Sequence, residues 1–127
     1  MEAGISDRKR IACTFLKLCA TGKVGQAYER HAAPGFIHHN PYFPGDAESL
    51  RKGMEAAAAQ FPDTKIETQR VFEDKNMVAV HSKVQHSAGG RPIAVVHIMR
   101  FKGERIAELW DIAVEEPADS PNENGMF

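Results

Sequence analysis

The sequence is poor in the features that mark several large classes of protein. It has two cysteines, one tryptophan and two tyrosines in 127 residues, and no apolar run approaches the roughly 20 residues that span a bilayer. Sixteen Lys and Arg residues balance seventeen Asp and Glu residues, for a net charge of -1. The longest basic run covers only residues 8–10, whereas a nucleic-acid surface needs a basic stripe to displace counterions from phosphates. We therefore expect neither nucleic acid nor a membrane among the partners.

The two cysteines also argue against a disulfide-stabilised protein. Cys13 and Cys19 are six residues apart in a segment with a helical pattern, which separates them too far along the helix axis for a disulfide. No signal-peptide pattern follows Met1. Free thiols without a secretion signal are typical of a cytoplasmic protein, which is the location that we expect.

Several catalytic motifs are missing as well. The sequence has no phosphate-binding glycine loop, no nucleophile elbow, no metalloprotease helix motif and no paired-cysteine spacing. This disfavours nucleotide-dependent and serine-hydrolase chemistry. The length is that of a single domain, residues 1–127. A domain of this size can form a core without disulfides or a bound metal, and it can enclose a pocket.

The order of the predicted elements is that of an α+β protein. Apolar residues recur near the helical period at residues 7–20, a shorter helix is expected at 26–31, and a third helix follows Asp46 with Leu50 and Met54 on its apolar side. In the second half of the sequence we expect four strands separated by short turns, at residues 64–72, 77–86, 91–101 and 105–114. A tail follows at residues 115–127. Helices followed by consecutive strands favour an antiparallel sheet that packs against the helices.

Asp111 is the most conspicuous acid of the sequence because it lies late in a largely apolar strand. Alternation places Asp111 on one face with Leu109 and Ala113, and Trp110 on the other face. Desolvation among apolar neighbours predicts a raised pKa, which suits proton abstraction from carbon near neutral pH. The alternative is an acid at the rim of the sheet that pairs with an arginine, such as Arg100 or Arg105, or caps a turn.

His97 is expected to be buried, because its strand is apolar on both faces. Which residue of the following strand lies opposite His97 depends on the turn at Gly103. If that turn has an odd number of residues, Leu109 lies opposite His97, and His97 and Asp111 share a face. A two-residue turn places His97 opposite Trp110 instead, and the sequence leaves both registers open.

The other histidines lie on predicted extended segments. His38 and His39 present opposite sides, so one of them can point inward, and Asn40 can orient a histidine or a ligand carbonyl through its amide. His81 can join the same interior, whereas His86 looks peripheral. Imidazoles and a carboxylate are also metal ligands, but these residues are spread over several strands without close pairing, so we expect no metal.

Five dispersed segments carry a family resemblance: residues 36–41, 78–81, 95–101, 105–111 and 124–127. Together they resemble the SnoaL-like polyketide cyclases of the nuclear transport factor 2-like superfamily. The resemblance implies a cone-shaped, strongly curved antiparallel sheet wrapped around N-terminal helices, with an apolar cavity and a homodimer formed through the sheet. It also implies general acid/base catalysis by an aspartate without cofactor or metal.

By the same resemblance, Asp111 matches the catalytic aspartate, and His39 matches the histidine of a His-Asn-Pro motif that turns toward the pocket. The sequence departs from the family at Leu109, where members often have His, and at His97, where they often have Asp.

These observations lead to one functional hypothesis and one rival. The first is a cofactor-independent enzyme that shifts a proton next to the carbonyl of a small, largely apolar compound. Asp111 would act as base, and His97 or His39 would orient it or bind the enolate oxygen. Candidate residues for contacting the ligand are Asn40, His81, Phe15, Phe36, Tyr42, Phe43, Met54, Phe61 and Trp110. The rival is a non-catalytic ligand-binding or dimerisation module of the same fold.

Overall fold

Three helices precede most of the sheet. The computed structural model describes residues 6–127, with helices α1 (Asp7–Ala20), α2 (Val24–His31) and α3 (Ala47–Gln60). The predicted first helix is confirmed, and the hydroxyl of Ser6 caps it by accepting the Lys9 N–H. Asp46 caps α3 in the same way. Side-chain caps of this kind explain why both helices begin where they do.

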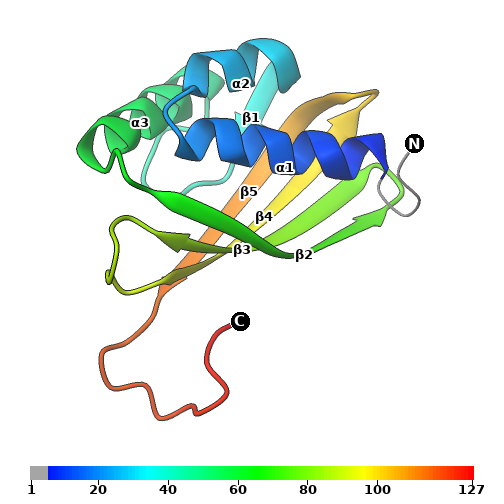
Figure 1. Cartoon of the computed structure of the whole chain (residues 1–127). Helices are drawn as coiled ribbons and strands as arrows, with labels where there is room; N and C mark the ends of the chain where they lie inside the picture. Colours follow the sequence, from blue (N-terminus) through cyan, green and yellow to red (C-terminus); the bar gives the residue numbers. More distant parts are fainter. Residues whose placement is uncertain (1–5) are drawn as a thin grey trace.

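Five strands form one sheet: β1 (Ala32–His38), β2 (Lys65–Asp74), β3 (Met77–Gln85), β4 (Ile93–Lys102) and β5 (Arg105–Glu115). Their order is β1-β5-β4-β3-β2, and the three helices cover one face (Figure 1). Neighbours among β2 to β5 are antiparallel, as predicted. The expectation of a fully antiparallel sheet is wrong because β1 pairs with β5 in parallel, and no hairpin joins these two strands to dictate their direction.

The hairpin between β4 and β5 has a register that neither predicted turn produces. Lys102 pairs with Arg105 across a two-residue turn, which by itself would bring His97 opposite Trp110. A β-bulge adds one residue, Ala107, to β5 and shifts the rest of the strand by one position. His97 consequently lies directly opposite Asp111.

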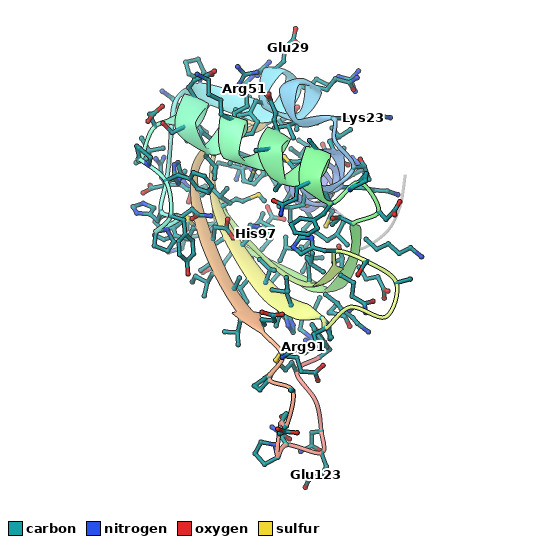
Figure 2. The ribbon with its side chains drawn as sticks, turned by 90° about the vertical axis from the view of Figure 1, so that its left-hand side faces the viewer. Lys23, Glu29, Arg51, Arg91, His97 and Glu123 are labelled. Carbon is teal, nitrogen blue, oxygen red and sulfur yellow. The ribbon has the colours of Figure 1, made fainter. Side chains whose placement is uncertain are left out.

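The core lies between the helices and the inward face of the sheet. Its largest fully buried side chains include Phe15 of α1, Leu50 of α3 and Met99, Phe101 and Leu109 of the sheet. His97 projects from β4 into the layer between sheet and helices (Figure 2). Beyond β5, residues 116–127 form no helix or strand and extend away from the helices (Figure 1). Within residues 6–127, no helix is both long and apolar enough to cross a membrane.

Candidate functional site

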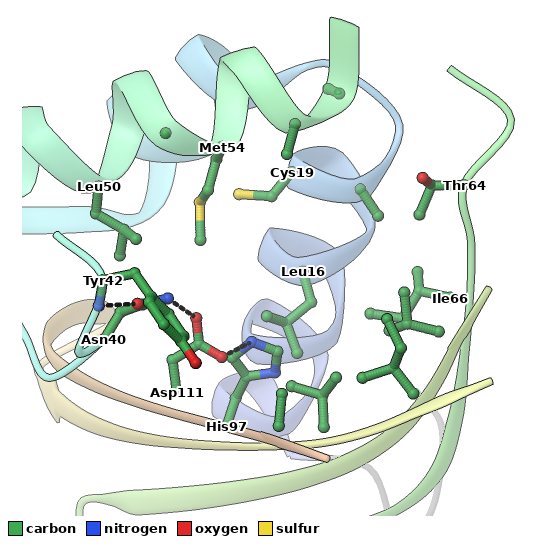
Figure 3. A pocket seen from close by; sticks show the side chains of 18 of the residues that line it. Leu16, Cys19, Asn40, Tyr42, Leu50, Met54, Thr64, Ile66, His97 and Asp111 are labelled. Carbon is green, nitrogen blue, oxygen red and sulfur yellow. Dashed lines mark hydrogen bonds and ion pairs between the residues drawn. The ribbon is translucent and has the colours of Figure 1, made fainter. Parts of the chain in front are cut away.

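A cavity of about 360 Å³ lies between helices α1 and α3 and the inward face of the sheet. Most of its wall is apolar, with contributions from Leu16 of α1, Met54 of α3 and Ile66 of β2 (Figure 3). Its hydrogen-bonding side chains are few: Asn40, Tyr42, Thr64, His86, His97 and Asp111, together with the thiol of Cys19. An apolar cavity with a few convergent polar groups is the usual form of a small-molecule site.

Asp111 and His97 form the polar centre of this cavity. The bulge in β5 makes them direct neighbours across the two strands, and His97 Nε2 lies 3.3 Å from Asp111 Oδ1. Both side chains are mostly buried, with exposed fractions of 9% for His97 and 15% for Asp111. Because an ionised carboxylate only accepts hydrogen bonds, Nε2 is the ring nitrogen that carries a proton toward it.

Asn40 binds the second oxygen of Asp111. Its Nδ2 donates to Asp111 Oδ2 at 2.8 Å, and its Oδ1 accepts the backbone N–H of Tyr42 at 2.9 Å (Figure 3). The second bond fixes the orientation of the amide, because only the oxygen can accept from that N–H. Both carboxylate oxygens of Asp111 therefore face a donor, and the carboxylate is held in one orientation.

His38 supports the loop that presents Asn40. Its side chain is buried, its Nδ1 accepts the backbone N–H of Asn40 at 3.0 Å, and its Nε2 donates to the carbonyl of Pro44 at 2.6 Å. The two bonds together specify the tautomer with the proton on Nε2. Of the adjacent pair, His38 is thus the inward histidine, and it acts on the position of Asn40.

The expectation of a raised pKa for Asp111 is wrong. Burial alone would raise it, but the adjacent His97 ring and the Asn40 amide stabilise the ionised form more strongly and lower the pKa below its ordinary value. A prediction from apolar neighbours alone fails here because both partners come from other parts of the chain. Asp111 is accordingly a carboxylate at neutral pH and can accept a proton.

Two buried polar atoms remain without a hydrogen-bond partner among residues 6–127. They are Nδ1 of His97 and the hydroxyl of Ser82, which both lie on the inward faces of neighbouring strands. Unpaired buried polar atoms are uncommon because they forfeit their hydration. The His97 ring thus has hydrogen-bonding capacity next to the cavity that the described part of the protein does not use.

His39 does not face the cavity, contrary to expectation. Its ring stacks on Trp110 with centroids 4.9 Å apart, and its Nε2 lies 2.6 Å from Glu108 Oε2 on the outer side of the sheet. The hydrogen bond from His39, reinforced by Arg100, lowers the pKa of Glu108. The cause is strand alternation: once His38 points inward, His39 must point outward. Trp110 lies outside the cavity for the same reason.

The arginine alternative for Asp111 is also excluded. Arg100 pairs with Glu108, with its Nε 3.0 Å from Oε1. Arg105 donates instead to the carbonyls of Glu29 and Ala32. Neither of these two arginines forms an ion pair with the carboxylate of Asp111.

His81 is likewise outside the cavity. It alternates with the buried Val80 and Ser82 and so faces outward, where it contacts Arg70 and stacks on Phe127 with centroids 5.8 Å apart. The tail therefore returns to the outer face of β3. The prediction that His81 joins the interior is wrong, because the inward positions of β3 are its even-numbered residues.

The predicted apolar ligand contacts divide into two groups. Tyr42, Phe43 and Met54 line the cavity. Phe15 and Phe36 belong to the core, where both pack against Tyr28. Phe61 lies beside the cavity and stacks on His86 with centroids 4.3 Å apart.

Thr64 and His86 are cavity residues that sequence reasoning missed. His86 was expected to be peripheral, near the tip of a hairpin. The ladder of β2 and β3 shifts its register between Thr68 and Arg70 and ends with Lys65 opposite Gln85, which brings Thr64 and His86 together at the wall of the interior. No turn residue predicts that shift. No group of three or more His, Cys, Asp or Glu residues suited to hold a metal ion occurs within residues 6–127.

Comparisons with solved structures identify the fold. A candidate polyketide cyclase from Acidithiobacillus ferrooxidans aligns with a TM-score of 0.73 at 21% identity, over 89% of this chain and 91% of the other. AclR, a candidate hydroxylase from Streptomyces galilaeus, aligns with a TM-score of 0.71 at 19% identity, over 84% and 77%. An NTF2-like protein of unknown function from Cytophaga hutchinsonii aligns with a TM-score of 0.66 at 19% identity, over 90% and 95%.

These likenesses show an NTF2-like fold. A search of curated proteins found no match. The model of the SnoaL-like domain matches residues 14–109, which is well over half of the sequence. The chain belongs to the SnoaL-like domain family.

Proposed function

We propose that the protein is a cofactor-independent enzyme that moves a proton next to the carbonyl group of a small, largely apolar compound, as in an aldol cyclisation or an isomerisation. The observation that carries this proposal is Asp111, an ionised carboxylate at the wall of an apolar cavity with a histidine against one oxygen and an amide against the other. Solved proteins of similar fold include a candidate polyketide cyclase and a candidate hydroxylase, which is consistent with chemistry in this cavity.

In the proposed reaction, Asp111 takes the proton from the carbon next to the carbonyl. The electron pair of the broken C–H bond moves onto the carbonyl oxygen and forms an enolate. Asn40 and His97 hold the carboxylate in place. In an isomerisation, the protonated Asp111 then returns the proton to another carbon of the same enolate. In an aldol cyclisation, the enolate carbon instead bonds to a second carbonyl carbon of the same compound, and Asp111 gives the proton to the alkoxide that forms. Because the Asp111 side chain is only 15% exposed, little water competes with the ligand for the carboxylate, which favours such a transfer.

The size and lining of the cavity support the proposed class of ligand. A volume of about 360 Å³ falls within the range of small-molecule sites. Of its charged groups, Asp111 is already matched by neighbouring donors, and neither Lys nor Arg is among the lining residues. The cavity therefore offers nothing to neutralise a polyanion, and an uncharged compound with a carbonyl fits better.

The test is hydrogen exchange in deuterated buffer. The methyl ketone 4-acetyl-4′-hydroxybiphenyl is incubated with the protein, and loss of the acetyl proton signal is followed by NMR. We expect exchange well above the buffer rate and a drop of roughly 100-fold or more in Asp111→Asn, because a positioned general base contributes about that much. Glu108→Gln, which changes an acid on the outer face of the same strand, should retain the wild-type rate. Exchange in Asp111→Asn at the wild-type rate would refute the role of Asp111.

A non-catalytic ligand-binding module is the second candidate. It is favoured by the fact that both Asp111 oxygens already have partners within the protein, which is also how a purely structural acid is held. Tight binding of the methyl ketone without any exchange above the buffer rate would support this second function.

We also propose that the protein forms a homodimer through the outer face of the sheet. Phe72, Ile112 and Val114 lie there with exposed fractions of 63%, 55% and 57%. Apolar side chains exposed on one sheet face are stabilised when a second surface covers them.

A further inference from the structure

Thr64 and His86 form a second polar group of the cavity, away from Asp111. β2 begins at Lys65 and β3 ends at Gln85, and these two residues are paired, so Thr64 and His86 lie just beyond the same end of this ladder. Thr64 and Asp111 appear on opposite sides of the cavity, with Leu16 between them in this view (Figure 3). The cavity thus has polar groups at both ends and apolar side chains between them.

The register of the sheet gives the scale of this separation. Val84 pairs with Ile93, His86 lies two residues beyond Val84, and His97 lies four residues from Ile93 in the other direction. Six residues of strand correspond to roughly 20 Å of backbone, and the reach of the two side chains shortens the gap. A ligand that touches both ends must therefore be elongated.

The hydrogen bonds of Thr64 specify the tautomer of His86. The Thr64 hydroxyl lies 2.8 Å from the carbonyl oxygen of Phe61 and 3.0 Å from His86 Nδ1. A hydroxyl has one proton, and a carbonyl oxygen can only accept, so Thr64 donates to Phe61 and accepts from His86. In the neutral ring, the proton of His86 is consequently on Nδ1, and Nε2 carries a lone pair.

The ring of His86 is also fixed in its plane, because it stacks on Phe61 at an interplanar angle of 20°. With Nδ1 used by Thr64, Nε2 is the remaining polar atom of the ring, and no other residue of the described chain forms a hydrogen bond with it. The ring lines the cavity. In the neutral ring, Nε2 is therefore the nitrogen left to accept a hydrogen bond from a ligand in the cavity, and no ring N–H is left to donate one.

We propose that His86 is a specificity residue that selects an elongated aromatic or alicyclic carbonyl compound with a hydroxyl group at the end opposite the carbonyl. The hydroxyl donates to His86 Nε2 while the carbonyl end lies at Asp111 and His97. This inference rests on the proposed function, because it places the reacting carbonyl at Asp111. The inference adds the class of ligand and names the residue that recognises the hydroxyl end of that ligand.

The test compares three rigid ketones that differ at one position. They are 4-acetylbiphenyl, its 4′-hydroxy derivative and its 4′-methoxy derivative, in which the far end carries no polar group, a donor or only an acceptor. Dissociation constants are measured by calorimetry with the whole protein at neutral pH. We expect the hydroxy compound to bind roughly three- to tenfold more tightly than the other two, the effect of one neutral hydrogen bond.

Variants assign this preference to His86. His86→Phe keeps an aromatic ring for stacking on Phe61 but removes both nitrogens, and it should bind the three ketones equally. Thr64→Val removes the partner that fixes the tautomer and should weaken the preference without removing the ring. His81→Phe is the matched control, because His81 lies on the outer face of β3, and its preference should equal that of the wild type.

The outcomes separate this inference from the proposed reaction. Equal affinities of the three ketones for the wild type, no binding of the hydroxy compound, or a preference that persists in His86→Phe would each overturn the inference. A preference that depends on His86, without proton exchange, would support the inference as a binding property and refute the reaction. Proton exchange without any preference for the hydroxy compound would support the reaction and overturn the inference.

Discussion

His97 and Asp111 face each other across β4 and β5, with Nε2 and Oδ1 3.3 Å apart, because a single inserted residue shifts the register of their hairpin. A regular two-residue turn would have paired His97 with Trp110 and turned Asp111 to the outer face. The bulge at Ala107 therefore brings this acid into the cavity. Bulges commonly redirect a side chain in this way next to functional sites.

The first prediction concerns the pH dependence of catalysis. Because neighbouring donors lower the pKa of Asp111, the carboxylate is ionised throughout the neutral and mildly acidic range. The acidic limb of kcat/KM for proton exchange should lie below the ordinary aspartate range of about 3.9. The measurement is the exchange rate of the acetyl protons between pH 3 and 8. An acidic limb between pH 6 and 7 would show that burial affects the pKa of Asp111 more strongly than its neighbouring donors do.

The same lowered pKa predicts how acid affects stability. A group whose pKa is lower in the folded than in the unfolded protein stabilises the fold above its unfolded pKa and loses that contribution as pH falls through its folded pKa. Wild type should therefore lose stability below about pH 4 that Asp111→Asn does not lose. Urea denaturation at pH 7 and pH 3 compares the two proteins, and an equal loss in both would contradict the prediction.

Asn40→Ala should change the behaviour of Asp111 without touching its strand. The substitution removes the donor to Oδ2 and the acceptor for the Tyr42 N–H. With one stabilising partner lost, the pKa of Asp111 rises and the acidic limb of exchange moves to higher pH. Asn122→Ala, in the tail, serves as the control. A rate that falls equally at every pH would indicate a role in loop structure alone.

Gly53→Ala should open the cavity at α3. A Cβ atom at this position would lie 2.4 Å from Cε1 of Phe43, so the ring must move away. Phe43 is 37% exposed and can swing outward, which removes part of the cavity wall and should weaken binding of 4-acetylbiphenyl several-fold. Gly25→Ala in α2 meets no atom within 4 Å. It should leave binding unchanged while adding up to about 1 kcal/mol of stability.

Ile112→Glu should weaken the proposed dimer. Ile112 is on the outer face of β5 with an exposed fraction of 55%, so a carboxylate there remains solvated in the monomer but would be desolvated in an interface. Sedimentation should show a dimer of wild type and a monomer of the variant with an unchanged circular dichroism spectrum. A wild-type protein that sediments at 14.0 kDa at all concentrations would disprove the dimer.

Much of the local structure could be predicted from the sequence. The helix at residues 7–20, the four later strands and the faces of β5 all follow from periodicity, caps and turn residues, which act over a few positions. The prediction that Asp111 shares a strand face with Leu109 and not with Trp110 also follows from such local signals. Local signals of this kind depend on neighbouring residues, so a single sequence contains them.

The tertiary structure decided the site. The partner of Asp111 depends on a bulge that no turn residue predicts. The lowered pKa of Asp111 depends first on His97 and then on Asn40, which is 71 positions away in sequence. The position of the lone pair on the His86 ring depends on the hydroxyl of Thr64. His39 illustrates the same limit, because only the direction of His38 determined that it faces outward. The sequence alone determined which elements form and which residues are available for chemistry. Which of those residues meet was settled by strand register and loop packing, since contacts between distant segments exist only once the chain has folded.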